Sequence, residues 1–155
     1  MTQVYDLLTA IENHFNNNEP NINTVTFGDI NKVDLTKLTL FPLAHFNIDD
    51  AEFKGSTIEF TVNLMCLDIV DEGEDWDGSF AGANNFQDVL NTQLQSINKL
   101  IDSLRGVRGY LAEAQYVVTN EPTAELLTDE DNNMINGWGV SIDIEVPNTI
   151  SGCEV

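Results

Sequence analysis

The chain has 155 residues, with 6 lysines and arginines against 26 aspartates and glutamates, so its formal net charge at neutral pH is −20. Nucleic-acid binders place basic side chains on phosphates, and proteins held at membrane surfaces use basic clusters, so this balance argues against both classes. Apolar residues still make up 42% of the chain, which is enough for the core of one globular domain.

The N-terminal segment is predicted to form an amphipathic helix over residues 3–16, with Thr2 as its N-cap. Apolar side chains recur there at helical spacing. They are Val4, Leu7, Leu8, Ile11 and Phe15. The Asn-Asn-Asn-Glu-Pro sequence at residues 16–20 ends the helix, because asparagine tolerates left-handed backbone and proline cannot continue a helix.

Three strands are expected next in the chain. A short strand covers residues 22–29, a second covers residues 39–48, and a third covers residues 58–70. An acidic turn at residues 49–52 and the Lys-Gly-Ser step at residues 54–56 separate the second strand from the third. The third has the strongest β pattern, since apolar and polar residues alternate along it and its far end is apolar on both faces. We therefore expect its centre to be buried.

Residues 71–85 are acidic and rich in glycine, without periodicity, and are predicted to form a long loop. A second helix follows, with Asn85 as its N-cap. Its apolar face is predicted to comprise Phe86, Leu90, Leu94, Ile97, Leu100, Ile101 and Leu104. Basic residues gather toward its C-terminal end, where the helix dipole favours cations, and Gly106 or Gly109 ends it.

Two more strands are predicted, at residues 112–119 and 138–146, with a short unassigned segment at residues 124–127 between them. Apolar and polar residues alternate in the last strand, so one of its faces is expected to be wet. The order is helix, three strands, loop, helix and two strands. It predicts one α+β domain over residues 1–155, in which a mainly antiparallel sheet carries both helices on one face, with a flexible C-terminal tail from about residue 148.

Redox and targeting signals are few. Cys66, in an apolar strand, and Cys153, near the C-terminus, are predicted to be free thiols, with Cys66 acting as a small core residue. The first residues have no basic region, and no apolar run approaches the roughly 18 residues of a membrane span. The expectation is a soluble protein made in the cytosol.

Catalytic motifs are missing from the sequence. There is no glycine-rich phosphate loop, no dinucleotide-binding glycine pattern, no zinc-protease motif and no nucleophile elbow. His14 and His45 are the two histidines, and neither has a motif partner that would make it a general base. We predict no enzyme activity and no cofactor.

One acidic pattern is similar to part of a metal-binding motif. Residues 71–78 read Asp-x-Gly-x-Asp-x-Asp-Gly, which resembles the first half of a calcium loop. An EF-hand would carry glutamate at the twelfth position, where this chain has Gly82, and a helix where a strand is predicted. A solvated acidic loop is the favoured interpretation here and at residues 129–133, and no metal ligand is predicted. A calcium site of another kind stays open as the alternative.

Trp76 and Phe80 are large aromatic residues within a polar loop. They have two interpretations. Either both fold back as a lid over the sheet, or they contact a partner, since aromatic side chains are the usual anchors of protein interfaces.

Five segments carry a family resemblance: residues 41–43, 58–70, 86–104, 121–122 and 136–148. With the predicted N-terminal helix, they give a sheet with a long protruding hairpin or loop, a central helix and a closing hairpin. This order is similar to that of the neck and tail-terminator (tail-completion) ring proteins of tailed bacteriophages. The segments span most of the chain.

The resemblance implies a structural virion protein, made in the cytoplasm of the host bacterium. It would form a ring of six or twelve copies at the portal–tail junction or the tail end, beside other phage portal or tail proteins. DNA would pass through without specific binding, because carboxylates facing the lumen repel phosphates. The ring contacts implied are Trp76, Asp77 and Phe80 in one loop and Asp129 and Asp131 in another.

An acidic interaction module is the main alternative. Such a protein, an inhibitor or a nucleic-acid mimic, docks its carboxylates on a basic partner. It is expected to carry dense acids on one continuous face, whereas the acids of this sequence concentrate in predicted loops and at outward strand positions. A small enzyme is a third, weaker alternative.

Overall fold

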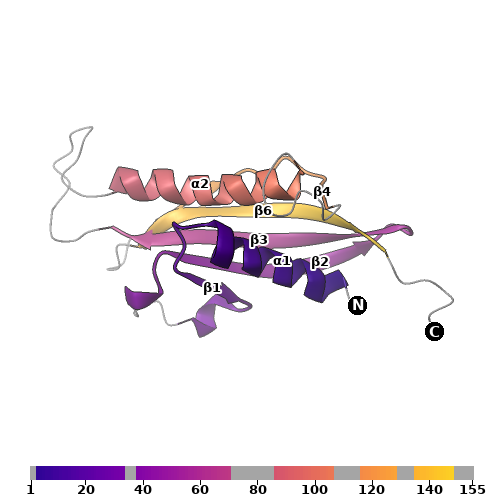
Figure 1. The fold of residues 1–155 in the computed structure, drawn as a ribbon, viewed down its shortest axis with the longest axis horizontal. Helices are drawn as coiled ribbons and strands as arrows, with labels where there is room; N and C mark the ends of the chain where they lie inside the picture. The colour runs from indigo at the N-terminus through magenta and orange to yellow at the C-terminus, as the bar shows by residue number, and fades with distance from the viewer. Residues whose placement is uncertain (1–2, 34–37, 71–85, 107–115, 129–134, 149–155) are drawn as a thin grey trace.

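The computed structural model describes residues 3–33, 38–70, 86–106, 116–128 and 135–148. In these ranges the chain forms an α+β fold, in which two α-helices cover one face of a mixed, mostly antiparallel six-stranded sheet (Figure 1). The predicted fold class is therefore confirmed.

The elements follow one another along the chain as helix, strands, helix and strands. They are α1 (Gln3–Asn18), β1 (Thr24–Phe27), the 3-10 helices η1 (Ile30–Lys32) and η2 (Leu38–Leu40), β2 (Leu43–Phe53), β3 (Thr57–Ile69), α2 (Phe86–Leu104), β4 (Val117–Val118), β5 (Glu125–Thr128) and β6 (Ile135–Pro147). The sheet order is β1-β2-β3-β6-β4, and β5 also pairs with β6. Only the β1–β2 pair is parallel among the described pairs.

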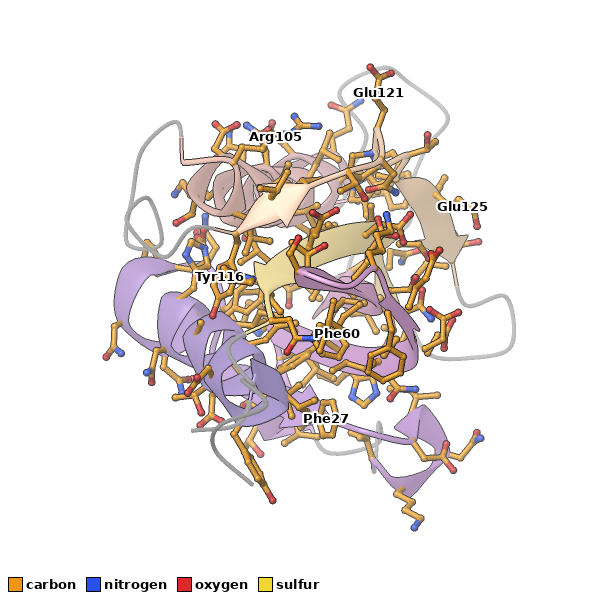
Figure 2. All side chains as sticks on the ribbon, turned by 90° about the vertical axis from the view of Figure 1, so that its right-hand side faces the viewer. Phe27, Phe60, Arg105, Tyr116, Glu121 and Glu125 are labelled. Atoms are coloured by element: carbon orange, nitrogen blue, oxygen red, sulfur yellow. The ribbon has the colours of Figure 1, made fainter. Side chains whose placement is uncertain are left out.

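The main core lies between the helices and the face of the sheet that we call the covered face. Alternate residues of β3 point to it, as the period of a strand requires. Its fully buried members include Leu7, Ile11, Phe15, Val62, Leu64, Cys66, Leu100, Leu104, Ile142 and Ile144. Viewed along the strands, α1 lies at the left and α2 at the top, both on the same side of the sheet (Figure 2). The helices thus leave the opposite face, the open face, free for other contacts.

A second apolar cluster covers one end of the open face. Its buried members are Phe41, Leu43, Leu67 and Ile135, and side chains from the β1–β2 connection and from β5 pack against them. This cluster explains why the far end of β3 is apolar on both faces. The prediction that the centre of this strand is buried is confirmed.

The β2–β3 hairpin is longer than predicted. Strand β2 begins at Leu43 and continues to Phe53, so the acidic residues 49–52 lie in the strand and form no turn. The register shifts between Ile48 and Asp50, which breaks the alternation that the sequence pattern relied on. The turn lies at Gly55, whose φ of +85° suits glycine. The hairpin reaches past the end of α2 in Figure 1.

The buried face of α2 also differs from the prediction. Leu94 is 41% exposed, whereas Gln93, Ser96 and Ser103 are buried. The helix is therefore rotated so that a partly polar stripe faces the core. Its predicted end is confirmed, because Gly106 has a φ of +71° and its N–H donates to the Ser103 carbonyl at 3.2 Å.

The C-terminal strands follow the prediction with one addition. The unassigned segment at residues 124–127 forms most of β5. Trp138 packs against the core on the inward face of β6, as predicted, and its indole N–H donates to the Leu90 carbonyl of α2 at 2.9 Å. Strand β4 is the part of the predicted strand 112–119 that lies within the described residues and forms a ladder.

Candidate functional site

The described loop and turn residues do not include the predicted contact residues. Trp76, Asp77 and Phe80 fall in residues 71–85, and Asp129 and Asp131 fall in residues 129–134, so all five lie outside the described part of the chain. The same holds for the calcium-like pattern and for Cys153. The surface that the structure does describe offers other candidates.

Two cross-strand rows of carboxylates lie side by side on the open face. In one row Glu52, Glu59 and Glu145 are neighbours on β2, β3 and β6, and in the other Asp50 and Asp143 flank Thr61. Residues directly opposite in a ladder share a face, so all five acids face the same way. We call Asp50, Glu52, Glu59, Asp143 and Glu145 the acidic face.

A single lysine holds the first row together. The Lys54 ammonium lies 3.0 Å from the Glu59 carboxylate and 3.7 Å from the Glu145 carboxylate. Thr119 donates a hydrogen bond to Glu59, and this bond together with Lys54 lowers the pKa of Glu59. The hydrogen bond with Glu59 in turn raises the pKa of Lys54. Lys54 thus offsets part of the repulsion between the aligned acids.

The second row is held by neutral donors. Thr61 Oγ1 donates to Asp143 at 2.8 Å, and the backbone N–H of Asp143 donates to the Asn120 side chain at 3.0 Å. Ser141 and Asn63 are hydrogen-bonded next to this row. The bond from Thr61 fixes the orientation of the Asp143 carboxylate without placing a positive charge beside it.

A shallow hollow of about 460 Å³ continues the acidic face toward β5. Asn63, Asn120, Glu121, Glu125 and Ser141 are among its polar lining residues. Glu121 and Glu125 point outward from the fold in Figure 2. The hollow is open, and Glu121 and Glu125 add two acidic residues to a lining that also includes the apolar residues Met65 and Leu127.

Exposed apolar side chains lie on both edges of the sheet. Phe27 on β1 is half-exposed and packs its ring against Phe46 at a centroid distance of 5.2 Å. Val117 on β4 and Leu126 on β5 are half-exposed at the other edge. Phe53, near the tip of the hairpin, is 78% exposed. The sequence pattern missed Phe53 because residues 49–52 were interpreted as a turn.

The histidines are placed in structural positions. His45 is buried, with its ring nitrogens 2.7 Å from Thr26 Oγ1 and 2.7 Å from the Gly28 carbonyl oxygen. His14 is also buried, and neither of its ring nitrogens has a hydrogen-bond partner. Its ring meets Phe15 edge-on. Burial lowers the pKa of His14 more strongly than nearby Glu19 raises it, and Lys99 lowers it further.

His14→Leu is expected to remove an acid-sensitive step from the unfolding free energy. Because the folded pKa of His14 lies below the ordinary value of about 6.5, the unfolded chain binds the proton more readily. His14 thus costs the native protein stability as the pH falls below about 6.5, by at most about 1.4 kcal/mol per pH unit. Urea unfolding of both proteins at pH 7.5 and pH 5 measures this. Parallel losses in the two proteins would contradict the assignment.

Cys66 is a free, fully buried thiol, as predicted, and burial raises its pKa far above the usual range. Such a thiol is protonated and inaccessible, which makes it inert as a nucleophile. In the described ranges no three His, Cys, Asp or Glu side chains gather in a metal-binding group. None of the described helices is long and apolar enough to cross a membrane.

Comparison with known proteins adds no family. No protein-family model matches the chain, and no curated protein matches it. The surface features of the described α+β fold that bear on function are the acidic face, the hairpin and the two sheet edges.

Proposed function

We propose that the chain is a structural, non-enzymatic subunit of a closed homo-oligomeric ring, of the kind found at the neck or tail end of tailed bacteriophages. The ring would hold six or twelve copies in the virion, in contact with other portal or tail proteins. The resemblance described above suggests this role, and the surface of the fold supports it in two ways.

The observation that carries the proposal is the placement of apolar side chains on opposite edges of one sheet. Phe27 lies on the β1 edge, and Val117 and Leu126 lie on the β4/β5 edge. A contact between these different edges is heterologous, and heterologous contacts generate rings when the rotation closes. Unpaired strand edges also supply backbone groups for such pairing. The exposed hairpin around Phe53 offers a further contact with the adjacent subunit of the ring.

The acidic face suits the wall of a DNA conduit. Its five carboxylates have Lys54 as their one ion-pair partner among the described residues. A surface of this kind repels phosphates, so that DNA passes without being held. We propose that this face lines the lumen.

The mass and shape of the purified protein test whether it assembles into a ring. Native mass spectrometry and negative-stain electron microscopy are expected to show a closed oligomer. Replacing the edge residues in the double variant Phe27→Thr/Leu126→Thr should reduce the oligomer population at least about tenfold at a given concentration, since burial of each side chain contributes roughly 1.5–3 kcal/mol. Threonine keeps the β propensity of both edges.

Val4→Gln is the matched control, because Val4 is exposed to a similar degree but lies on helix α1 and on neither edge strand. It should leave the oligomer intact. An oligomer unaffected by the edge variant would contradict the edge contacts. A stable monomer that co-purifies with a basic protein would contradict the ring itself.

The second candidate is an acidic interaction module that binds a basic partner. One observation favours it: the two carboxylate rows form the continuous acidic face that this function requires, although the sequence had placed most acids in loops. Binding to a basic partner that is lost in high salt and weakened by Glu52→Gln/Glu145→Gln, from a monomeric protein, would support this function over the ring.

A further inference from the structure

A small cavity of about 280 Å³ lies where α2 begins, on the covered side of the sheet. It is open to solvent and is lined by residues from four separated parts of the chain, namely the segment after α1, Pro42 just before β2, the end of β3 and the first turns of α2. The polar members are Asn21, Asp68, Asp88, Thr92 and Gln93. The acidic face lies on the other side of the sheet and plays no part in this cavity.

Two carboxylates share this cavity without a counter-charge. Asp68 is partly buried, and its carboxylate accepts one short hydrogen bond, from the Ile69 N–H at 2.7 Å. Within the described ranges, neither Asp68 nor Asp88 forms an ion pair with a lysine or arginine.

Gln93 supplies an independent sign that the cavity takes a polar ligand. Its side chain is fully buried, and neither the amide oxygen nor the amide nitrogen has a hydrogen-bond partner. Buried amides are almost always partnered, by protein, by water or by an ion. Gln93 is among the residues that line the same cavity as the two carboxylates, so an unpartnered amide lies beside them.

The donor set decides the class of ligand. Carboxylate, amide and hydroxyl oxygens are hard donors, and the cavity lining contains no histidine or cysteine for a softer metal. Calcium takes six to eight oxygens and accepts amide carbonyls and several waters among them. A volume of about 280 Å³ holds one ion with its waters. Two carboxylates with neutral oxygens suit calcium better than magnesium, which demands a stricter octahedron.

We propose that this cavity is a calcium site, with Asp68 and Asp88 as charged ligands and the Gln93 amide oxygen as a neutral ligand. Binding would tie the end of β3 to the start of α2. The site is independent of the proposed ring. It is also separate from residues 71–78, whose sequence resembles half of a calcium loop.

Titration of the full-length protein with calcium chloride, against magnesium chloride at equal ionic strength, tests the site. Calcium should bind saturably by calorimetry and raise the melting temperature by about 3 °C or more at a hundredfold excess over the Kd. Asp68→Asn and Asp88→Asn should each weaken calcium binding at least about tenfold. Asp50→Asn, on the acidic face, is the matched control and should leave the Kd unchanged.

Gln93→Leu separates a ligand from a packing residue. Leucine removes the unpartnered amide, so the calcium-free protein should melt at the same temperature or higher, while its affinity for calcium falls. Absence of saturable binding, or equal effects of calcium and magnesium, would overturn the site. So would loss of binding in Asp71→Asn/Asp75→Asn/Asp77→Asn with full binding retained in the Asp68 and Asp88 variants.

Discussion

Gly137→Ala is expected to destabilise the fold by about 3 kcal/mol or more, which lowers the melting temperature of a chain this size by roughly 6–12 °C. A Cβ at this position would overlap the carbonyl oxygen of Cys66 and lie 2.9 Å from its carbonyl carbon and 3.0 Å from Leu67 Cα. These are backbone atoms of β3, which cannot rotate away. Strand β6 cannot retreat either, because Gly137 pairs with Leu67 on one side and with Leu127 on the other.

Gly139→Ala provides the matched control in the same strand. There the new Cβ would meet the Leu127 side chain, with Cδ1 at 3.1 Å, and a leucine terminus can move. The expected cost is below about 1 kcal/mol. Urea and thermal unfolding of both variants measure the difference. Similar stabilities for the two alanine variants would show that β3 and β6 are less tightly apposed at Gly137 than the structure has them.

The fold was largely predictable because most of its strands and helices carry a periodic apolar pattern. Strands β3 and β6 alternate along their length, and the period of two assigns their faces directly. The prediction was wrong for β2 beyond Ile48, since one register shift reverses the alternation and four acidic or small residues then resemble a turn. The rotation of α2 was missed because its buried stripe includes Gln93, Ser96 and Ser103, which a hydrophobic pattern counts as exposed.

The candidate surfaces were less predictable than the fold. The acidic face needs residues from three strands, and only the β2–β3 and β3–β6 registers show that Glu52, Glu59 and Glu145 form one row. In the sequence, the outward positions of Asp143 and Glu145 in the last strand were the one sign of this acidic face. The exposed edge residues follow from strand order, which a single sequence does not contain. The contact roles of the loop residues Trp76, Asp77, Phe80, Asp129 and Asp131 stay predictions, because these residues lie outside the described part of the chain.

Lys99→Met is expected to lower the unfolding free energy by about 2–3 kcal/mol, a large effect for a lysine that is half-exposed. The reason lies in its partner. The Glu19 side chain has no exposed surface, its Oε2 lies 3.6 Å from the Lys99 ammonium, and its Oε1 accepts one hydrogen bond from the Asn21 N–H at 3.2 Å. Removing Lys99 leaves a buried carboxylate that water cannot reach.

The double variant Glu19→Gln/Lys99→Met should recover most of the loss, because a glutamine amide keeps the acceptor for Asn21 and carries no charge to bury. Glu19→Gln alone should cost less than Lys99→Met alone, since the lysine left behind turns to solvent. Urea unfolding of the four proteins gives the coupling energy of the pair as a double-mutant cycle. A coupling energy below about 0.5 kcal/mol would mean that solvent enters between α1 and α2 and hydrates Glu19. A coupling energy of about 2 kcal/mol or more, by contrast, would identify this ion pair as a main polar link between the segment that follows α1 and the C-terminal half of α2.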